Sequence, residues 1–228
     1  MYAVILAGGK GTRMGDLTKD TPKPLVMIND KPIMQYTLDN LPASITDVVV
    51  IVGYLGDQIK SYFGDTYNDI SIQYVSQTEQ KGTDHALRTA QELLQEEERF
   101  LVVMGDDLYK PQDLQKLVRY PYSLLAYYSF AAKNFGLVGV DENDNFESII
   151  EKSPNHSEGL VNAAAYVLGK EYFNTPAVLL DDGEHALPHT LLTMYKDHPA
   201  RVVHALDWQP VGNPDQLAEA TERIGEFL

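Results

Sequence analysis

Residues 6–25 read LAGGKGTRMGDLTKDTPKPL and continue an apolar run, residues 3–6, that predicts a buried strand. The loop after this strand carries almost no side-chain bulk, because it contains Gly8, Gly9, Gly11 and Gly15. Backbone N–H groups in such a loop can point inward and form an anion-binding concavity. Arg13 and Lys23 add two positive charges nearby. Glycines that admit phosphates and cations that neutralise them suit a nucleoside triphosphate site.

Two better-known phosphate loops do not fit this stretch. The P-loop needs Gly-Lys-Ser/Thr after its spacer, whereas Lys10 is followed by Gly11 and Thr12. The dinucleotide fingerprint needs a glycine where Met14 stands. Turn geometry alone can also explain a cluster of glycines. Turn geometry does not explain the prolines on both sides of Lys23, which restrict the backbone and pre-position its ammonium group.

The whole stretch resembles the signature of sugar-1-phosphate nucleotidylyltransferases, the enzymes that make nucleoside-diphosphate sugars. The resemblance implies that Arg13 and Lys23 are catalytic and grip the triphosphate during attack on its α-phosphorus. It also implies nucleotide contacts for a set of residues in the loop: Leu6, Gly8, Gly9, Gly11 and Thr12.

The composition predicts a cytoplasmic protein that does not bind nucleic acid. The 228 residues are 44% apolar, contain no cysteine, and include no apolar run long enough to cross a bilayer. The N-terminus lacks the pattern of a secretory signal. The net charge of −15 argues against a nucleic-acid partner, and it makes a metal cation easy to recruit beside anionic substrates. We expect one domain over residues 1–228, with a nucleotide half to about residue 120 and an acceptor half beyond it.

The order of expected elements predicts an α/β fold, a three-layer α/β/α sandwich around a Rossmann-like mixed sheet. Strands at 48–52, 70–75 and 100–104 alternate with helices at 55–63 and 83–95, which favours parallel strands. The second half instead predicts antiparallel strands, a helix at 185–195, a strand at 201–205 and a last helix at 214–227. The antiparallel strands are expected at 122–130, 137–140, 146–151 and 161–168. The ligand crevice should lie at the carboxyl ends of the parallel strands.

Residues 77–83, QTEQKGT, lie between a predicted strand and a predicted helix. Gly82 permits close backbone approach, and Thr83 is a good helix cap. The family resemblance implies that Gln77, Gly82 and Thr83 bind the base of the nucleotide. An ordinary strand-to-helix turn would look much the same, so that alternative stays open.

Gly105-Asp106-Asp107 follows the strand at 100–104, at the edge of the crevice. A carboxylate there could hold a hard divalent cation, and Mg²⁺ is the usual ion beside phosphates. The resemblance points to Asp106 as the metal ligand in preference to Asp107, and it assigns Gly105 to the sugar phosphate.

Two segments of the second half resemble acceptor-binding segments of the family. Glu151 and Lys152 end a predicted strand, and the resemblance assigns Glu151 to a sugar hydroxyl and Lys152 to the sugar phosphate. A solvated ion pair would read the same way. Asn162 is the further expected hydroxyl contact, and Ala164 stands where relatives have a glycine beside the sugar.

The main departure from the family lies near Trp208. Relatives have an aspartate two residues after this tryptophan, as the second metal ligand, whereas this chain has Pro210. Asp207 is near in sequence, but in an extended segment its side chain would face away from the side of residue 210.

The sequence therefore predicts an Mg²⁺-dependent nucleotidylyltransferase that converts a nucleoside triphosphate and a sugar 1-phosphate into a nucleoside-diphosphate sugar and pyrophosphate. Two alternatives stay open: a cytidylyltransferase acting on a small alcohol or choline phosphate, and a non-catalytic nucleotide-sensing relative. The sequence leaves the base, the sugar and the oligomeric state undecided, a homo-oligomer included. No membrane partner is expected.

Overall fold

The apolar runs of the first half form the parallel centre of one sheet. In a computed structural model, which describes residues 1–151, 154–180 and 183–228, β1 (Tyr2–Ala7) lies between β4 (Asp47–Val52) and β7 (Phe100–Met104). Beyond β4 lies β6 (Ile70–Ser76), and these four strands are all parallel. Val48 to Val52 are buried, as expected for a strand covered on both faces.

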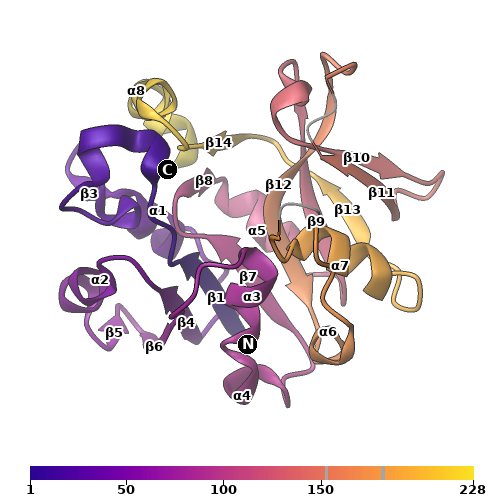
Figure 1. Ribbon diagram of the computed structural model, residues 1–228, viewed down its shortest axis with the longest axis horizontal. Helices are drawn as coiled ribbons and strands as arrows, with labels where there is room; N and C mark the ends of the chain where they lie inside the picture. Colours follow the sequence, from indigo (N-terminus) through magenta and orange to yellow (C-terminus); the bar gives the residue numbers. More distant parts are fainter. Residues whose placement is uncertain (152–153, 181–182) are drawn as a thin grey trace.

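The second half extends the same sheet with mainly antiparallel strands (Figure 1). The long strand β12 (Gly159–Leu168) pairs antiparallel with β7, so the sheet is continuous between the two halves. Four further strands follow around it: β9 (Ser123–Ser129), β10 (Gly136–Val140), β11 (Phe146–Glu151) and β13 (Arg201–His204). Of these, β13 pairs parallel with β9. The short β5 (Thr66–Tyr67) forms the opposite edge beside β6.

Helices cover both faces of the sheet because successive strand residues point to opposite sides. Ile5 packs in one buried cluster and its neighbour Val4 in another. The first cluster includes side chains of α1 (Ile33–Asp39), α2 (Gly56–Phe63) and α5 (Pro111–Leu117). The second includes α3 (Thr83–Arg88), α4 (Gln91–Leu94), α6 (Glu171–Asn174) and α7 (Leu187–Met194). The predicted three-layer α/β/α sandwich with a mixed sheet is confirmed.

A third buried cluster attaches the end of the chain to its beginning. The helix α8 (Pro214–Arg223) and the short η4 (Ile224–Phe227) pack through Ala220 and Phe227 against Met14 and Ile28. In Figure 1 this yellow segment lies beside the indigo N-terminal loop. That loop holds four short elements: η1 (Thr12–Thr18), η2 (Lys23–Leu25), β2 (Met27–Ile28) and β3 (Lys31–Pro32).

A two-stranded ribbon that the sequence did not predict completes the fold. It pairs β8 (Asp107–Tyr109) antiparallel with β14 (Trp208–Pro210), with Asp107 opposite Pro210 and Tyr109 opposite Trp208. Both strands are only three residues long. Their pairing depends on the tertiary structure, and local sequence periodicity does not reveal it.

Three helix boundaries differ from the expected ones. The helix predicted for 83–95 breaks into α3 and α4 near Thr89, whose hydroxyl donates to Ala86 O (2.6 Å) and so competes with the helical backbone bonds. The helix predicted from 185 begins at Leu187, because the backbone of His185 is paired with Lys81 and Asp84. The last helix gives way to the tighter η4 after Arg223. None of the described helices has the length and apolarity that a membrane span requires.

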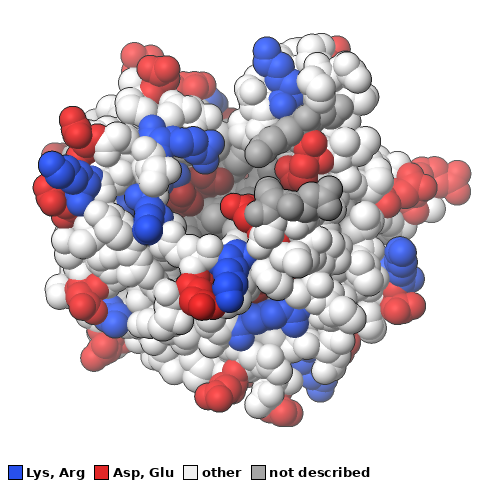
Figure 2. Space-filling model, viewed as in Figure 1, with Lys and Arg blue, Asp and Glu red and all other residues white. Residues whose placement is uncertain are grey.

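Charges are distributed unevenly on the face shown in Figure 2. This face is hollowed at its centre, where the two halves of the chain meet. Lys and Arg side chains lie at the rim on the side of the N-terminal loop, and acidic side chains lie within the hollow. Some of the few cations of this acidic protein are thus placed beside its opening.

Strand β12 contains an irregularity at Ala164, which has φ 53° in the left-handed region that favours glycine. The register with β9 shifts between Asn162 and Tyr166. Asn162 stabilises this bulge, since its Oδ1 accepts from Ala164 N (3.0 Å) and its Nδ2 donates to the Tyr166 hydroxyl (2.7 Å). A glycine, which the family resemblance leads us to expect at this position, would adopt this backbone angle without strain.

We predict that Ala164→Gly changes the free energy of unfolding by less than about 1 kcal/mol. Relief of the strained φ offsets the greater flexibility of glycine in the unfolded chain. Ala165→Gly is the matched control in the same strand, because Ala165 is fully buried and has no positive φ. It should lose about 1 kcal/mol or more. Equal losses for the two variants in urea titrations would contradict this account.

Candidate active site

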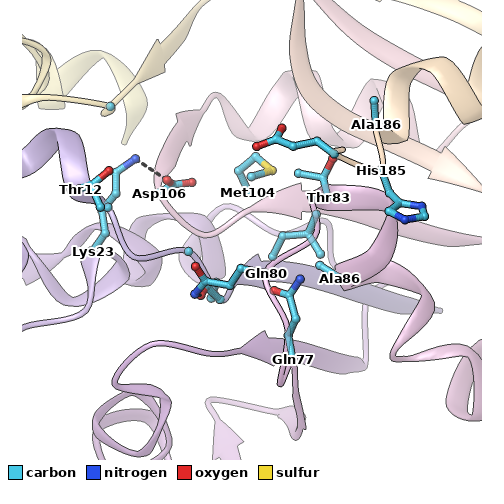
Figure 3. Close-up of a pocket in the computed structure, with 18 of the residues that line it drawn as sticks. Thr12, Lys23, Gln77, Gln80, Thr83, Ala86, Met104, Asp106, His185 and Ala186 are labelled. Carbon is cyan, nitrogen blue, oxygen red and sulfur yellow. Dashed lines mark hydrogen bonds and ion pairs between the residues drawn. The ribbon is translucent and has the colours of Figure 1, made fainter. Parts of the chain in front are cut away.

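A cavity of about 770 Å³ lies at the carboxyl ends of the parallel strands (Figure 3). Its walls come from six places in the chain: the glycine loop after β1, the loop after β6, the turn after β7, the end of β11, the segment leading into α7, and the loop after β14. The described residues that line it include Gly8, Gly11, Arg13, Lys23, Gln77, Gly82, Thr83, Asp106, Glu151 and His185. The crevice therefore lies where the parallel strands predicted it.

The glycine loop makes room for Lys23. Gly11 has φ 64°, and a Cβ on it would lie 3.1 Å from the Cβ of Lys23 and 3.2 Å from a methyl group of Thr18. The stem of Lys23 therefore runs along the bare backbone of Gly11. Its ammonium group reaches across the cavity and forms an ion pair with the carboxylate of Asp106.

A second contact joins the glycine loop to the loop after β6. The carbonyl of Gly8 accepts from Gln80 Nε2 (2.9 Å), and Gln77 Oε1 lies 2.8 Å from where a Cβ on Gly8 would stand. A side chain at position 8 would thus displace Gln77. The two loops form one continuous wall of the cavity.

The backbone at Gly82 packs against the second half of the chain. Gly82 has φ 100°, and a Cβ on it would lie 2.5 Å from the carbonyl oxygen of His185. The neighbouring Thr83 hydroxyl accepts from Leu187 N (3.4 Å). Glycine is needed here for both its backbone angle and its small size. This contact explains Gly82 structurally, and a role in base binding stays a prediction.

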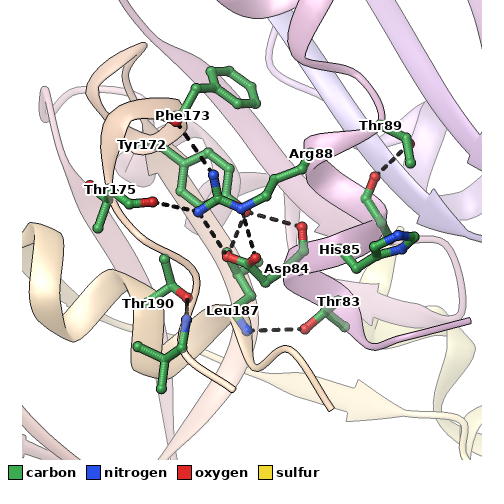
Figure 4. Close-up of polar contacts among 12 residues, drawn as sticks. Thr83, Asp84, His85, Arg88, Thr89, Tyr172, Phe173, Thr175, Leu187 and Thr190 are labelled. Atoms are coloured by element: carbon green, nitrogen blue, oxygen red, sulfur yellow. Dashed lines mark hydrogen bonds and ion pairs between the residues drawn. The ribbon is translucent and has the colours of Figure 1, made fainter. Parts of the chain in front are cut away.

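A buried polar cluster holds the start of α3, and with it the Gly82–Thr83 turn (Figure 4). The Asp84 carboxylate is fully buried and accepts from Arg88 Nε (2.8 Å) and from the Tyr172 hydroxyl (2.9 Å). Arg88 also donates to Thr175 O (2.7 Å), and its guanidinium lies 4.9 Å from the ring centroid of Tyr172. The cluster joins α3 of the first half to α6 of the second.

The turn after β7 presents one carboxylate to the cavity and buries the next. Asp106 lines the cavity, whereas Asp107 accepts from the indole Nε1 of Trp208 (3.1 Å). Burial, together with the negative charge of Asp106, raises the pKa of Asp107 to about 7. Of the two adjacent carboxylates, Asp106 is the one that could face a ligand.

The carboxylate of Asp207 binds other protein groups and does not line the cavity. It is buried, accepts from Trp208 N (2.8 Å) and forms an ion pair with Arg223 (2.5 Å). Pro210 pairs with Asp107 across the ribbon. Residues 207 and 210 therefore do not share a side, as an extended segment predicts.

Most residues predicted for the site line the cavity, although their roles stay predictions. Twelve do so: Leu6, Gly8, Gly9, Gly11, Thr12, Arg13, Lys23, Gln77, Gly82, Thr83, Asp106 and Glu151. Gly105 and Asn162 are not among the described residues that line it. A Cβ on Gly105 would lie 3.0 Å from Ile5, so this glycine serves close packing, and the Asn162 side chain is engaged within β12. Lys152 lies outside the described residues.

The sequence reasoning missed several residues of the lining. Gln80 lies inside the segment predicted to bind the base, and its bond to Gly8 O is the contact that was overlooked. His185 and Gly212 come from distant segments and carry no local signal. Gly212 lies beside the guanidinium of Arg13, since a Cβ on it would be 3.5 Å from Arg13 Nη2.

Comparison with known proteins assigns the family. The sequence model described as Nucleotidyl transferase matches residues 2–226. The chain belongs to the nucleotidyl transferase family. Bifunctional protein GlmU of Methanocaldococcus jannaschii is 30% identical over 227 residues, which are 98% of this chain and 54% of that protein. The chain thus spans about half the length of the GlmU relatives it matches.

Other similar proteins match over most of their own length. UTP–glucose-1-phosphate uridylyltransferase AglF of Haloferax volcanii is 28% identical over 99% of this chain and 97% of its own. A heptose 1-phosphate guanylyltransferase of Campylobacter jejuni is 35% identical over 76% of this chain and 78% of its own. The UTP-bound UGPase of Acinetobacter baumannii shares the fold, with a TM-score of 0.87 at 20% identity over 98% of this chain and 93% of that one.

We predict that Arg88→Leu lowers the free energy of unfolding by about 3 kcal/mol, because it leaves the buried Asp84 carboxylate without its charged partner. Arg119→Leu is the matched control, since it removes the same charge from an exposed position. Urea titrations of both variants decide the matter. A loss for Arg88→Leu no larger than that for Arg119→Leu would show that the Asp84 cluster does not stabilise the fold.

Proposed function

We propose that this nucleotidyl transferase moves a nucleotidyl group from a nucleoside triphosphate to a sugar 1-phosphate, giving a nucleoside-diphosphate sugar and pyrophosphate. The observation that carries this proposal is the gathering of Gly11, Arg13, Lys23 and Asp106 around one cavity at the carboxyl edge of the sheet. The relatives named as uridylyl- and guanylyltransferases of sugar 1-phosphates support the same reaction class.

The reaction needs no nucleophilic side chain, because a phosphate oxygen of the acceptor attacks the α-phosphorus directly. Catalysis then depends on alignment and on neutralising negative charge. The glycine loop offers backbone N–H groups and leaves space for the phosphates. Lys23 and Arg13 carry the positive charges of the cavity wall and would stabilise the charge that develops on the triphosphate.

Glu151, which lines the cavity at the end of β11, is the residue that we assign to the acceptor. Its carboxylate can accept a hydrogen bond from a sugar hydroxyl. Glu151 Oε1 lies 2.8 Å from where a Cβ on Gly136 would stand, so a side chain at position 136 would collide with the Glu151 carboxylate. The base, the sugar and the oligomeric state are outside this proposal.

A divalent cation fits the cavity when the nucleotide supplies most of its ligands. Within the described part of the chain, no group of three or more His, Cys, Asp and Glu residues could hold a metal ion. Asp106 offers one carboxylate, and Mg²⁺ tolerates several waters and phosphate oxygens in its shell. Bound there, the ion would help to neutralise the negative charge of the triphosphate.

We predict that Lys23→Ala reduces turnover by about 10²–10³-fold, the usual cost of removing one charge-stabilising group. The measurement is pyrophosphate release, with each of four nucleoside triphosphates paired with hexose 1-phosphates, phosphocholine and a phosphorylated small alcohol. Lys19→Ala, at an exposed lysine of the same segment, is the control and should keep full activity.

The acceptor panel also decides between the candidate reactions. Release only with phosphocholine or the alcohol phosphate would replace the sugar reaction with the cytidylyltransferase alternative. If none of the acceptors gives pyrophosphate release although the protein binds nucleotide measurably, a non-catalytic nucleotide-binding protein would be favoured. Near-normal turnover of Lys23→Ala would remove Lys23 from the mechanism.

We predict that Pro210→Asp tightens Mn²⁺ binding to the nucleotide-free protein, because it adds a carboxylate at the position to which the family resemblance assigns the second metal ligand, on the strand paired with β8 next to Asp106. Leu206→Asp adds the same charge at an exposed position of the same segment and should not tighten it. Calorimetric titration measures both affinities. Asp106→Asn should abolish the binding. Tight binding that survives Asp106→Asn but is lost in Asp207→Asn would show that Asp106 is the wrong carboxylate.

A further inference from the structure

The ammonium of Lys23 occupies the one carboxylate to which the proposed function assigns the metal. The two groups form an ion pair, and their side chains are only 10% and 23% exposed. Ion pairs at this level of burial are less screened by water and salt than surface pairs. In the nucleotide-free protein, Asp106 is therefore already neutralised by a protein cation.

Both partners are held in place by the fold. Lys23 begins the short η2 between two prolines, and its stem lies along Gly11. Asp106 precedes β8, which is fixed by its pairing with β14 and by the bond from Trp208 to Asp107. The pair therefore brings together two segments 83 residues apart in the sequence.

A divalent cation and the Lys23 ammonium cannot both sit on Asp106 without repelling each other. We infer that Lys23 competes with the metal for Asp106 until a nucleoside triphosphate engages Lys23, so that Lys23 couples metal binding to nucleotide binding. This inference rests on the proposed function, and it adds a second role for Lys23 that is distinct from stabilising the transition state.

The triphosphate relieves the competition because it offers Lys23 other anionic oxygens within the same cavity. Its phosphates also supply ligands to the metal. The coupling is reciprocal, so that the metal must strengthen triphosphate binding by the same factor. A free protein that holds no tight metal thus becomes a good metal site at the moment the substrate arrives.

Two features of the chain lead to weak metal binding without nucleotide, and they can be separated. The absence of a carboxylate at position 210 removes a ligand, whereas Lys23 blocks the ligand that is present. Removing the ammonium tests the second effect alone. Lys23→Met keeps most of the apolar stem that packs on Gly11, and Lys23→Gln keeps a polar end.

The experiment measures Mn²⁺ binding to nucleotide-free protein by electron paramagnetic resonance of the free ion. A neighbouring charge commonly changes the affinity of a carboxylate for a cation by a factor of about ten or more. Lys23→Met and Lys23→Gln should therefore bind Mn²⁺ at least about tenfold more tightly than the wild type. Lys19→Met, which removes an exposed positive charge from the same segment, should leave the affinity unchanged within about twofold.

The tighter Mn²⁺ binding of the Lys23 variants must also depend on Asp106. Adding Asp106→Asn to Lys23→Met should return Mn²⁺ binding to the level of Asp106→Asn alone. Unchanged affinity in both Lys23 variants, an equal gain in Lys19→Met, or a gain that survives Asp106→Asn would each overturn the inference. The absence of Mn²⁺ binding from the wild type and from every variant would also overturn it. Pyrophosphate release by the wild type would then decide separately whether the proposed reaction stands. Thermal unfolding of each variant confirms that it is folded.

Discussion

The parallel pairing of β1 with β7 is the constraint on which the site depends. Leu6 lies opposite Met104 in this pairing, and Leu6 lies opposite Ile51 of β4 on the other side. Because the strands run in the same direction, the loops that follow them emerge at one edge of the sheet. The glycine loop and the Asp106 turn are therefore neighbours in space, although Lys23 and Asp106 are 83 residues apart in the sequence. The Lys23–Asp106 ion pair is a direct consequence.

The acidic composition makes the placement of each cation important. The chain has 18 Lys and Arg residues against 33 Asp and Glu. Arg13 and Lys23 lie at the cavity, while Arg88 and Arg223 are paired with buried carboxylates at two junctions of the fold. The anionic substrate that we propose would therefore meet positive charges at the glycine loop, even though the protein as a whole is negative. Attraction of the substrate would thus depend on the charges beside the cavity more than on the net charge of the protein.

The sequence predicted the features that depend on local patterns and missed those that depend on distant contacts. Apolar runs such as residues 48–52 identified the parallel strands, and the Pro-Lys-Pro setting identified Lys23. The ribbon of β8 and β14 escaped prediction because three-residue strands have no period to recognise. His185 lines the cavity because its backbone pairs with residues 81 and 84, an arrangement that no local motif records. The side chain of Asn162 stabilises the bulge at Ala164, which the sequence did not reveal, and its assignment to the substrate stays a prediction.

The C-terminal segment shapes the site without lining it with a carboxylate. Asp113 accepts from Leu206 N (2.8 Å), and Arg223 bonds both Asp207 and Gln209, so the start of β14 is held from two sides. Pairing of Pro210 with Asp107 then fixes the turn that presents Asp106, and Gly212 lies beside Arg13. A proline suits the end of such a short edge ribbon, because it needs no ladder hydrogen bond there. In the function we propose, this segment orients one carboxylate and one arginine, and the oxygens of the triphosphate complete the coordination of the metal.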